Sequence, residues 1–128
     1  MDLIRKSKIF SRLALKEKMT LLKKIKTLST VSTELQQTSN LYEKLNKLIS
    51  DDTMTDLPQN ASQLKAKKFY SQKIHDELNR VSNRKFFLEK EASDIRLSAG
   101  KAKTKVNKAL EKSAVYNQLY QIEIENKS

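Results

Sequence analysis

The sequence predicts an all-α protein, an antiparallel coiled-coil hairpin of two long helices. Glycine and proline occur once each in 128 residues, and a chain with so few of the residues that mark turns changes direction rarely. Only one interval, SDDTMTDLPQNAS, gathers turn-forming and capping residues. On both sides of it, apolar residues recur every seven positions, which is the pattern of coiled coils.

The first helix is expected over residues 3–49. Its stripe is the less regular of the two, because three of its d positions are polar. The a positions are Ala14, Leu21, Leu28, Leu35, Tyr42 and Ile49, and the d positions are Leu3, Phe10, Glu17, Lys24, Val31, Thr38 and Leu45.

The turn is expected over residues 50–60. Pro58 disfavours helical geometry at Leu57, the residue before it. Asn60 and Gln63 have the three-residue spacing of a capping box, which predicts that the second helix begins near Ala61.

The second helix is expected over residues 61–122, followed by a short frayed C-terminus. Its stripe runs through seven heptads, more than the three or four that indicate a coiled coil, and only Lys85 and Ser113 depart from it. The a positions are Leu78, Lys85, Ala92, Ala99, Val106, Ser113 and Tyr120, and the d positions are Ile74, Val81, Leu88, Ile95, Ala102, Ala109 and Tyr116.

Folding the chain at the turn brings the two stripes together as a single domain of residues 1–128. The expected pairs are Leu35 with Leu78, Val31 with Val81 and Phe10 with Ala102. In the N-terminal part, large residues of the first helix then face small residues of the second, as close helix packing requires. We expect a monomer, and self-association through apolar residues off the stripe stays open.

The net charge of +11 is unevenly distributed. Residues 1–29 carry nine Lys and Arg against two acids, residues 30–63 carry two against five, and residues 64–113 carry fourteen against six. No apolar run approaches the roughly 18 residues that a membrane span needs, and no secretory signal is recognisable. We therefore expect a cytoplasmic protein.

The stretch SAGKAKTK is similar to a phosphate-binding loop but fails its spacing. The motif G-x-x-x-x-G-K-[ST] requires a glycine where Ile95 stands and a hydroxyl residue where Ala102 stands. Gly100 falls at heptad position b. It is either a tolerated weak point of the helix or a place where a partner approaches or the helix bends.

Nothing in the sequence indicates an enzyme. The single histidine, His75, precedes Asp76, but a catalytic pair would also need a nucleophile and a pocket, and we expect a pair of helices to offer no pocket of drug-like volume. The chain has no cysteine and no cluster of metal-ligating residues. We expect no catalytic residues, no cofactor, no metal and no small-molecule substrate.

Lysines form one face of the second helix, at spacings of four, three and four: Lys101, Lys105, Lys108 and Lys112. Such a face can neutralise nucleic-acid phosphates, or it can simply keep a coiled coil soluble. The sequence has no RNA-binding aromatic signature and no groove-reading motif.

Several large apolar residues do not fit the stripes. They either cover the flanks of the helix pair or form partner surfaces. They are Leu13, Leu15, Leu22, Phe69, Tyr70, Phe86, Phe87, Leu97 and Leu110. Near the turn, Leu41 and Leu48 are expected to form an apolar patch with Phe69 and Tyr70.

The segments FSRLALKEKMTLLKKIKTL and QQTSNLYEKLNKLISDD resemble the first helix of the FliJ and YscO-type coiled-coil stalk proteins of flagellar and type III export. The resemblance implies a stalk that couples a hexameric export ATPase to the export gate, a membrane protein, and that handles export chaperones. It also implies a protein associated peripherally with a membrane export apparatus. Aromatic residues often stand in that family where this chain has Lys44 and Leu48.

The resemblance indicates a gate-like patch, and the distribution of charge indicates a basic end as the second partner surface. The gate-like patch is Gln37, Leu41, Lys44, Leu48, Phe69, Tyr70 and Ile74. The basic end, which we expect to enter the ATPase ring, is Arg5, Lys8, Arg12, Lys16, Lys101, Lys105, Lys108 and Lys112. The alternative function is that of a basic coiled-coil protein that binds nucleic acid or associates with the chromosome.

Overall fold

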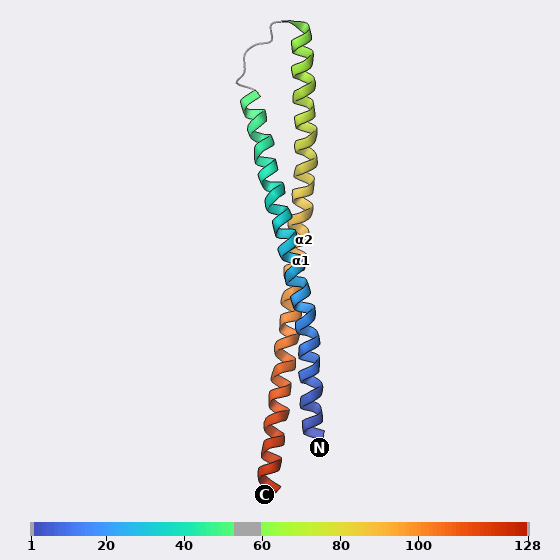
Figure 1. Cartoon of the computed structure of the whole chain (residues 1–128), viewed down its shortest axis with the longest axis vertical. Helices are drawn as coiled ribbons and strands as arrows, with labels where there is room; N and C mark the ends of the chain where they lie inside the picture. The colour runs from blue at the N-terminus through green and yellow to red at the C-terminus, as the bar shows by residue number, and fades with distance from the viewer. Residues whose placement is uncertain (1, 53–59, 128) are drawn as a thin grey trace. The chain divides into compact units, whose positions relative to one another are not determined.

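The computed structural model describes residues 2–52 and 60–127 and shows an all-α antiparallel hairpin of two long helices (Figure 1). Helix α1 comprises Asp2–Asp52 and helix α2 comprises Ala61–Lys127. The predicted fold class is confirmed. The part of the turn that contains Leu57 and Pro58 lies outside the described residues.

The start of α2 agrees with the predicted cap. The side-chain Oδ1 of Asn60 accepts a 2.8 Å hydrogen bond from the backbone N–H of Gln63. The backbone N–H of Leu64 donates to the carbonyl of Asn60 at 3.1 Å. Asn60 therefore satisfies one of the backbone donors that the first turn of a helix leaves without a partner.

Both helices continue beyond their predicted ends. Residues 50–52, expected in the turn, belong to α1, and α2 continues through residues 123–127 in place of a frayed C-terminus. In this last turn Lys127 Nζ lies 3.3 Å from Glu123 Oε1, an i,i+4 pair. Such a pair supports a helix by a few tenths of a kcal/mol, and the cation interacts favourably with the helix C-terminus.

The predicted heptad stripes are confirmed by burial. Every a and d position predicted in the two helices is buried or half-buried, including the polar Glu17, Lys24 and Lys85. The buried apolar residues all belong to these positions: Ala14, Val31, Leu45, Ile74, Val81, Leu88, Ala92, Ala102, Val106 and Ala109.

The pairing of the two stripes differs from the prediction by one heptad. Ser7 lies against Ser113, where the predicted pairing of Leu35 with Leu78 would place Val106. Leu45 packs in one cluster with Ile74, where the predicted register would place Lys67. A seven-residue shift carries each a position to another a position, so periodicity cannot distinguish the two registers.

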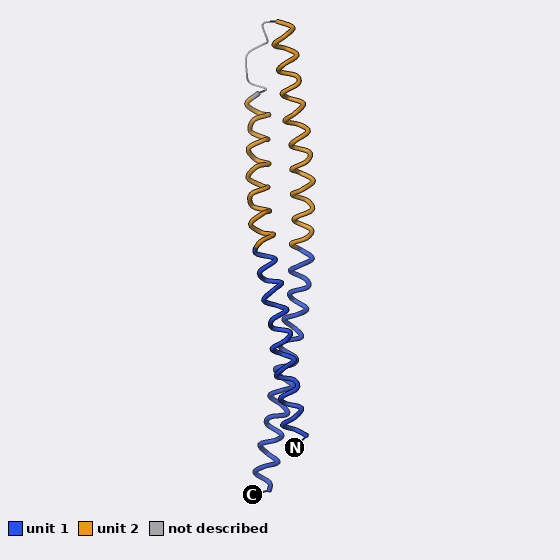
Figure 2. Tube along the Cα trace, turned by 45° about the vertical axis from the view of Figure 1, so that its right-hand side comes forward, with its two compact units in different colours: residues 1–29, 93–128 blue, residues 30–92 orange. Residues whose placement is uncertain are grey.

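The hairpin divides into two compact units (Figure 2). Unit 1 comprises Met1–Ser29 and Ser93–Ser128, and unit 2 comprises Thr30–Ala92. In each unit a segment of α1 packs antiparallel against a segment of α2. Unit 2 contains a cluster in which Tyr42, Ile49 and Leu78 surround three buried residues, namely Leu45, Ile74 and Val81.

Candidate partner-binding surfaces

The two units differ sharply in charge. Unit 1 carries sixteen Lys and Arg against six Asp and Glu, a net charge of +10. Unit 2 carries ten against nine, a net charge of +1. Nearly the whole excess of +11 therefore belongs to one structural unit.

The structure gathers the predicted basic end in unit 1. All eight residues belong to this unit and all are exposed. On α2, Lys105, Lys108 and Lys112 line one groove of about 160 Å³, which also contains Phe10 and Leu13. Lys101 does not line this groove, so three of the four lysines share it.

An aromatic stack that the sequence analysis missed lies among these cations. The rings of Phe10 and Tyr116 stack with centroids 5.6 Å apart and an interplanar angle of 7°. Lys6 Nζ lies 5.5 Å from the Tyr116 centroid, and Lys112 Nζ lies 5.3 Å from the Phe10 centroid. The predicted register placed Phe10 opposite Ala102, whereas the observed register brings it to an aromatic partner.

The gate-like patch falls entirely within unit 2, but its members do not form one apolar surface. Leu48 and Tyr70, 45% and 53% exposed, line a common groove of about 710 Å³. Charged side chains line the same groove: Lys73, Asp76, Glu77 and Arg80. This groove therefore combines two half-exposed apolar side chains with both signs of charge.

Ile74 lines the same groove from the seam. Its side chain is only 6% exposed, because it occupies a d position and packs with Leu45 and Val81 in the core of unit 2. It therefore offers a partner much less surface than Leu48 or Tyr70.

The remaining members of the patch are exposed but lie outside that groove: Gln37, Leu41, Lys44 and Phe69. The Phe69 ring is partly covered by Lys73 Nζ, 5.0 Å from its centroid. Of the four residues predicted to form one apolar patch, Leu48 and Tyr70 line the common groove, and Leu41 and Phe69 do not.

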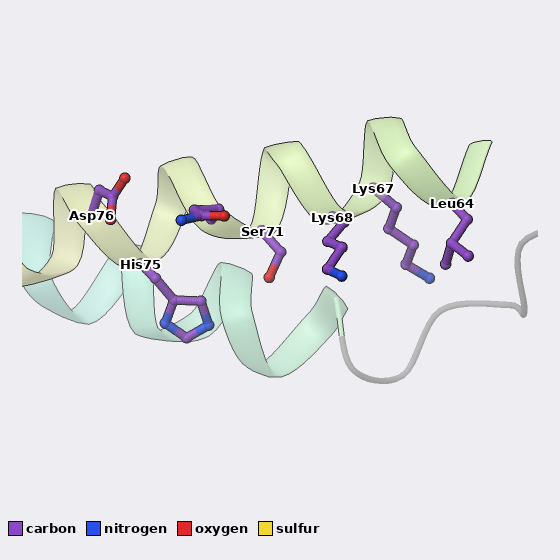
Figure 3. A pocket seen from close by; sticks show the side chains of 7 residues that line it. Leu64, Lys67, Lys68, Ser71, His75 and Asp76 are labelled. Atoms are coloured by element: carbon purple, nitrogen blue, oxygen red, sulfur yellow. The ribbon is translucent and has the colours of Figure 1, made fainter. Parts of the chain in front are cut away.

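His75 lies in an open groove along the first turns of α2 (Figure 3). The groove holds about 550 Å³ but is open to solvent, so it does not enclose a ligand as a small-molecule pocket does. Its lining comes from α2 alone: Leu64, Lys67, Lys68, Ser71, Gln72, His75 and Asp76. Among the described residues, Ser71 and His75 line this groove with no hydrogen bond between them.

Most apolar residues off the stripes are exposed to solvent. The predicted set of nine is at least 42% exposed throughout, and Phe86 reaches 72%. The Arg84 guanidinium lies over the Phe87 ring at 5.6 Å, and Arg84 also forms an ion pair with Glu34 across unit 2. These side chains are therefore available to partners in the isolated chain.

Gly100 lies within α2 and does not adopt a positive φ. A Cβ atom built there would meet nothing within 4 Å. Its carbonyl accepts a 3.1 Å hydrogen bond from Thr104 Oγ1. No contact within the chain therefore requires a glycine, and the continuous helix excludes a phosphate-binding loop.

Comparison of the chain with known protein families, with curated proteins and with solved structures found no match. Among the described residues, neither helix has a stretch apolar enough to cross a membrane. Over those same residues, no three His, Asp or Glu side chains come together as a metal site would require.

Proposed function

We propose that the chain is a non-enzymatic interaction protein, a coiled-coil stalk that couples a hexameric export ATPase to an export gate and engages export chaperones. The observation that carries the proposal is the concentration of a net charge of +10 on unit 1, against +1 on unit 2. The resemblance of the α1 sequence to FliJ and YscO-type proteins supplies the identity of the partners. In this role the protein is cytoplasmic and associates peripherally with the membrane apparatus.

Charge on this scale favours encounter with an acidic partner. A field of one sign raises association rates, and salt weakens it because the Debye length is about 8 Å at physiological ionic strength. The eight residues of the basic end are exposed, so their charges act on the solvent side of unit 1. In our proposal this unit binds the ATPase ring, and the Leu48–Tyr70 groove of unit 2 contacts the gate.

Charge reversal on unit 1 tests the ATPase assignment. Replacing Lys101, Lys105 and Lys108 by Glu should weaken binding of the export ATPase at least tenfold and flatten its salt dependence, measured by surface plasmon resonance at several ionic strengths. Binding of the gate should be unaffected. The matched control reverses three exposed lysines of unit 2, Lys65, Lys68 and Lys73, and should leave ATPase binding within about twofold.

A double substitution in the Leu48–Tyr70 groove tests the gate assignment separately from the ATPase assignment. Leu48→Ala combined with Tyr70→Ala should weaken gate binding and spare ATPase binding. Circular dichroism must show intact helices in every variant. Unchanged ATPase affinity of the unit 1 reversals at low salt would mean that the basic end is only a solvated surface, and the ATPase assignment would then be abandoned.

The second candidate function is binding of nucleic acid, which is favoured by the exposed lysines at positions 101, 105, 108 and 112 of α2. A pull-down from nuclease-treated lysate distinguishes it from the stalk. Recovery of an ATPase after nuclease treatment supports the stalk. Loss of all partners, together with salt-dependent binding of labelled duplex DNA that the same charge reversals abolish, supports the alternative.

A further inference from the structure

One groove in unit 1 has an apolar floor and apolar walls. It holds about 330 Å³ and is lined by both helices: Ser11, Arg12, Ala14, Leu15, Lys18, Val106 and Leu110. Its floor is the seam, since Ala14 and Val106 are buried. Its walls are Leu15 and Leu110, which remain 61% and 51% exposed.

An exposed apolar stripe continues from this groove along α1. Leu15, Met19, Leu22 and Ile25 follow one another at spacings of four, three and three residues, which places them on one side of a helix. None occupies an a or d position, and each is at least 48% exposed. We name the groove and this stripe together the outer face.

The outer face exposes larger side chains than the seam beneath it buries. The buried residues of unit 1 are three alanines and one valine, namely Ala14, Ala102, Ala109 and Val106. The leucines in the seam of unit 1, such as Leu21 and Leu28, are only half-buried, while Leu15 and Leu22 lie outside the seam and are exposed. Apolar residues at helical spacing on an exposed face are what an amphipathic helix recognises when it packs in a groove.

Charge identifies the occupant. Two cations, Arg12 and Lys18, line the groove, and no carboxylate does. Unit 1 as a whole carries +10, so a second copy would bring an equal positive charge to the same surface. We propose that the outer face binds an acidic amphipathic helix of a partner protein, which packs as a third helix against unit 1.

The geometry specifies what the partner helix must present. Leu15 and Ile25 are ten positions apart, about 15 Å along a helix, so three to four turns of the partner suffice. Its apolar residues should recur at i, i+3 or i+4 and i+7, with Glu or Asp at the edges that meet Arg12 and Lys18. This requirement is independent of the export components proposed above.

The probe is a labelled peptide of four heptads with Leu at a and d and Glu at e and g. At neutral pH such a peptide does not pair with itself, because its flanking charges repel. We expect it to bind the full chain in fluorescence anisotropy, and the same peptide with Lys at e and g to bind at least tenfold more weakly. Equal binding of the two peptides would overturn the charge argument.

Paired substitutions locate the binding site. Leu15→Gln with Leu22→Gln should weaken binding of the acidic peptide at least tenfold. Glutamine has good helix propensity, so the hairpin should stay folded. The control pair is Leu13→Gln with Leu119→Gln, two exposed leucines of unit 1 outside the outer face, and it should change binding less than twofold. Similar losses in both pairs would overturn the assignment.

Two further measurements exclude other occupants. Sedimentation equilibrium of the unmodified chain should show a monomer, and a dimer that Leu15→Gln with Leu22→Gln converts to monomer would assign the outer face to a second copy. Vesicles of anionic phospholipid should not compete with the peptide, and competition would assign the face to a membrane surface. Either result would overturn the proposal, while failure of ATPase binding would leave it intact because no export component enters the test.

Discussion

Unit 1 and unit 2 use the same heptad pattern in different ways. Unit 2 buries branched side chains such as Leu45, Val81 and Leu88, of which Leu88 is 0% exposed. In unit 1 the fully buried residues are alanines and a valine, and the leucines of its stripe, Leu3, Leu21 and Leu28, are only half-buried. The difference shows that a regular stripe predicts which residues face the other helix, but not how strongly the two helices are held together.

The energetic consequence follows from side-chain size. Burial contributes about 0.8 kcal/mol per CH₂ group, so a seam of alanines contributes less than a seam of leucines at the same number of positions. Unit 1 replaces part of that contribution by polar contacts, including a hydrogen bond from Lys24 Nζ to Ser98 Oγ. We therefore expect unit 1 to open more readily than unit 2.

Truncation in the two seams should have the largest effect and should differ between the units. Leu88→Ala in unit 2 should reduce the free energy of unfolding by about 3 kcal/mol, because it removes a fully buried side chain. Val106→Ala in unit 1 should cost about 2 kcal/mol, because it removes two buried carbon atoms and not three. Urea denaturation followed by circular dichroism measures both, and equal losses would remove the contrast between the units.

A disulfide across unit 1 should compensate for its weaker seam. The hydroxyl oxygens of Ser7 and Ser113 are 3.4 Å apart, so Ser7→Cys with Ser113→Cys should cross-link on oxidation and stabilise the hairpin by about 2 kcal/mol or more. The matched pair, Ser7→Cys with Val106→Cys, represents the register displaced by one heptad. Efficient oxidation of that pair and not of the first would contradict the observed register.

Gly100→Ala should give a smaller gain confined to unit 1. The added Cβ meets no atom within 4 Å, and alanine is favoured over glycine inside a helix by about 1 kcal/mol. The free energy of unfolding should rise by that amount, measured with the same urea titration. A loss of stability would show that the backbone at Gly100 needs the freedom of glycine.

The sequence was sufficient for the features that depend on local pattern. The heptad stripes and the Asn60 cap could be predicted because they depend on spacing within a few turns. The concentration of charge in what became unit 1 could also be recognised, because it is a property of composition along the chain. The last helical residues of α1 (50–52) and of α2 (123–127) were not predicted, because the position of a helix end depends on weak contributions of a few tenths of a kcal/mol.

The features that depend on pairing could not be predicted. The burial of Ile74 follows from its d position, whereas its place in one groove with Leu48 and Tyr70 depends on pairing. The meeting of Phe10 with Tyr116 and of Leu48 with Tyr70 depends on which heptad of α2 faces which heptad of α1. Long-range register is a property of two segments together, and neither segment encodes it alone.

The serine pair of unit 1 distinguishes one register from the next. Each hydroxyl donates to the other residue's backbone carbonyl at 3.0 Å, so Ser7 and Ser113 form a reciprocal clasp across the seam. A slide of one helix by a heptad, about 10 Å, would keep the apolar stripes in contact but break this clasp and bring Val106 against Ser7. The apolar stripes therefore allow registers that differ by one heptad, and the hydrogen bonds between Ser7 and Ser113 favour one of these registers. The two cysteine pairs described above would trap two of these registers separately.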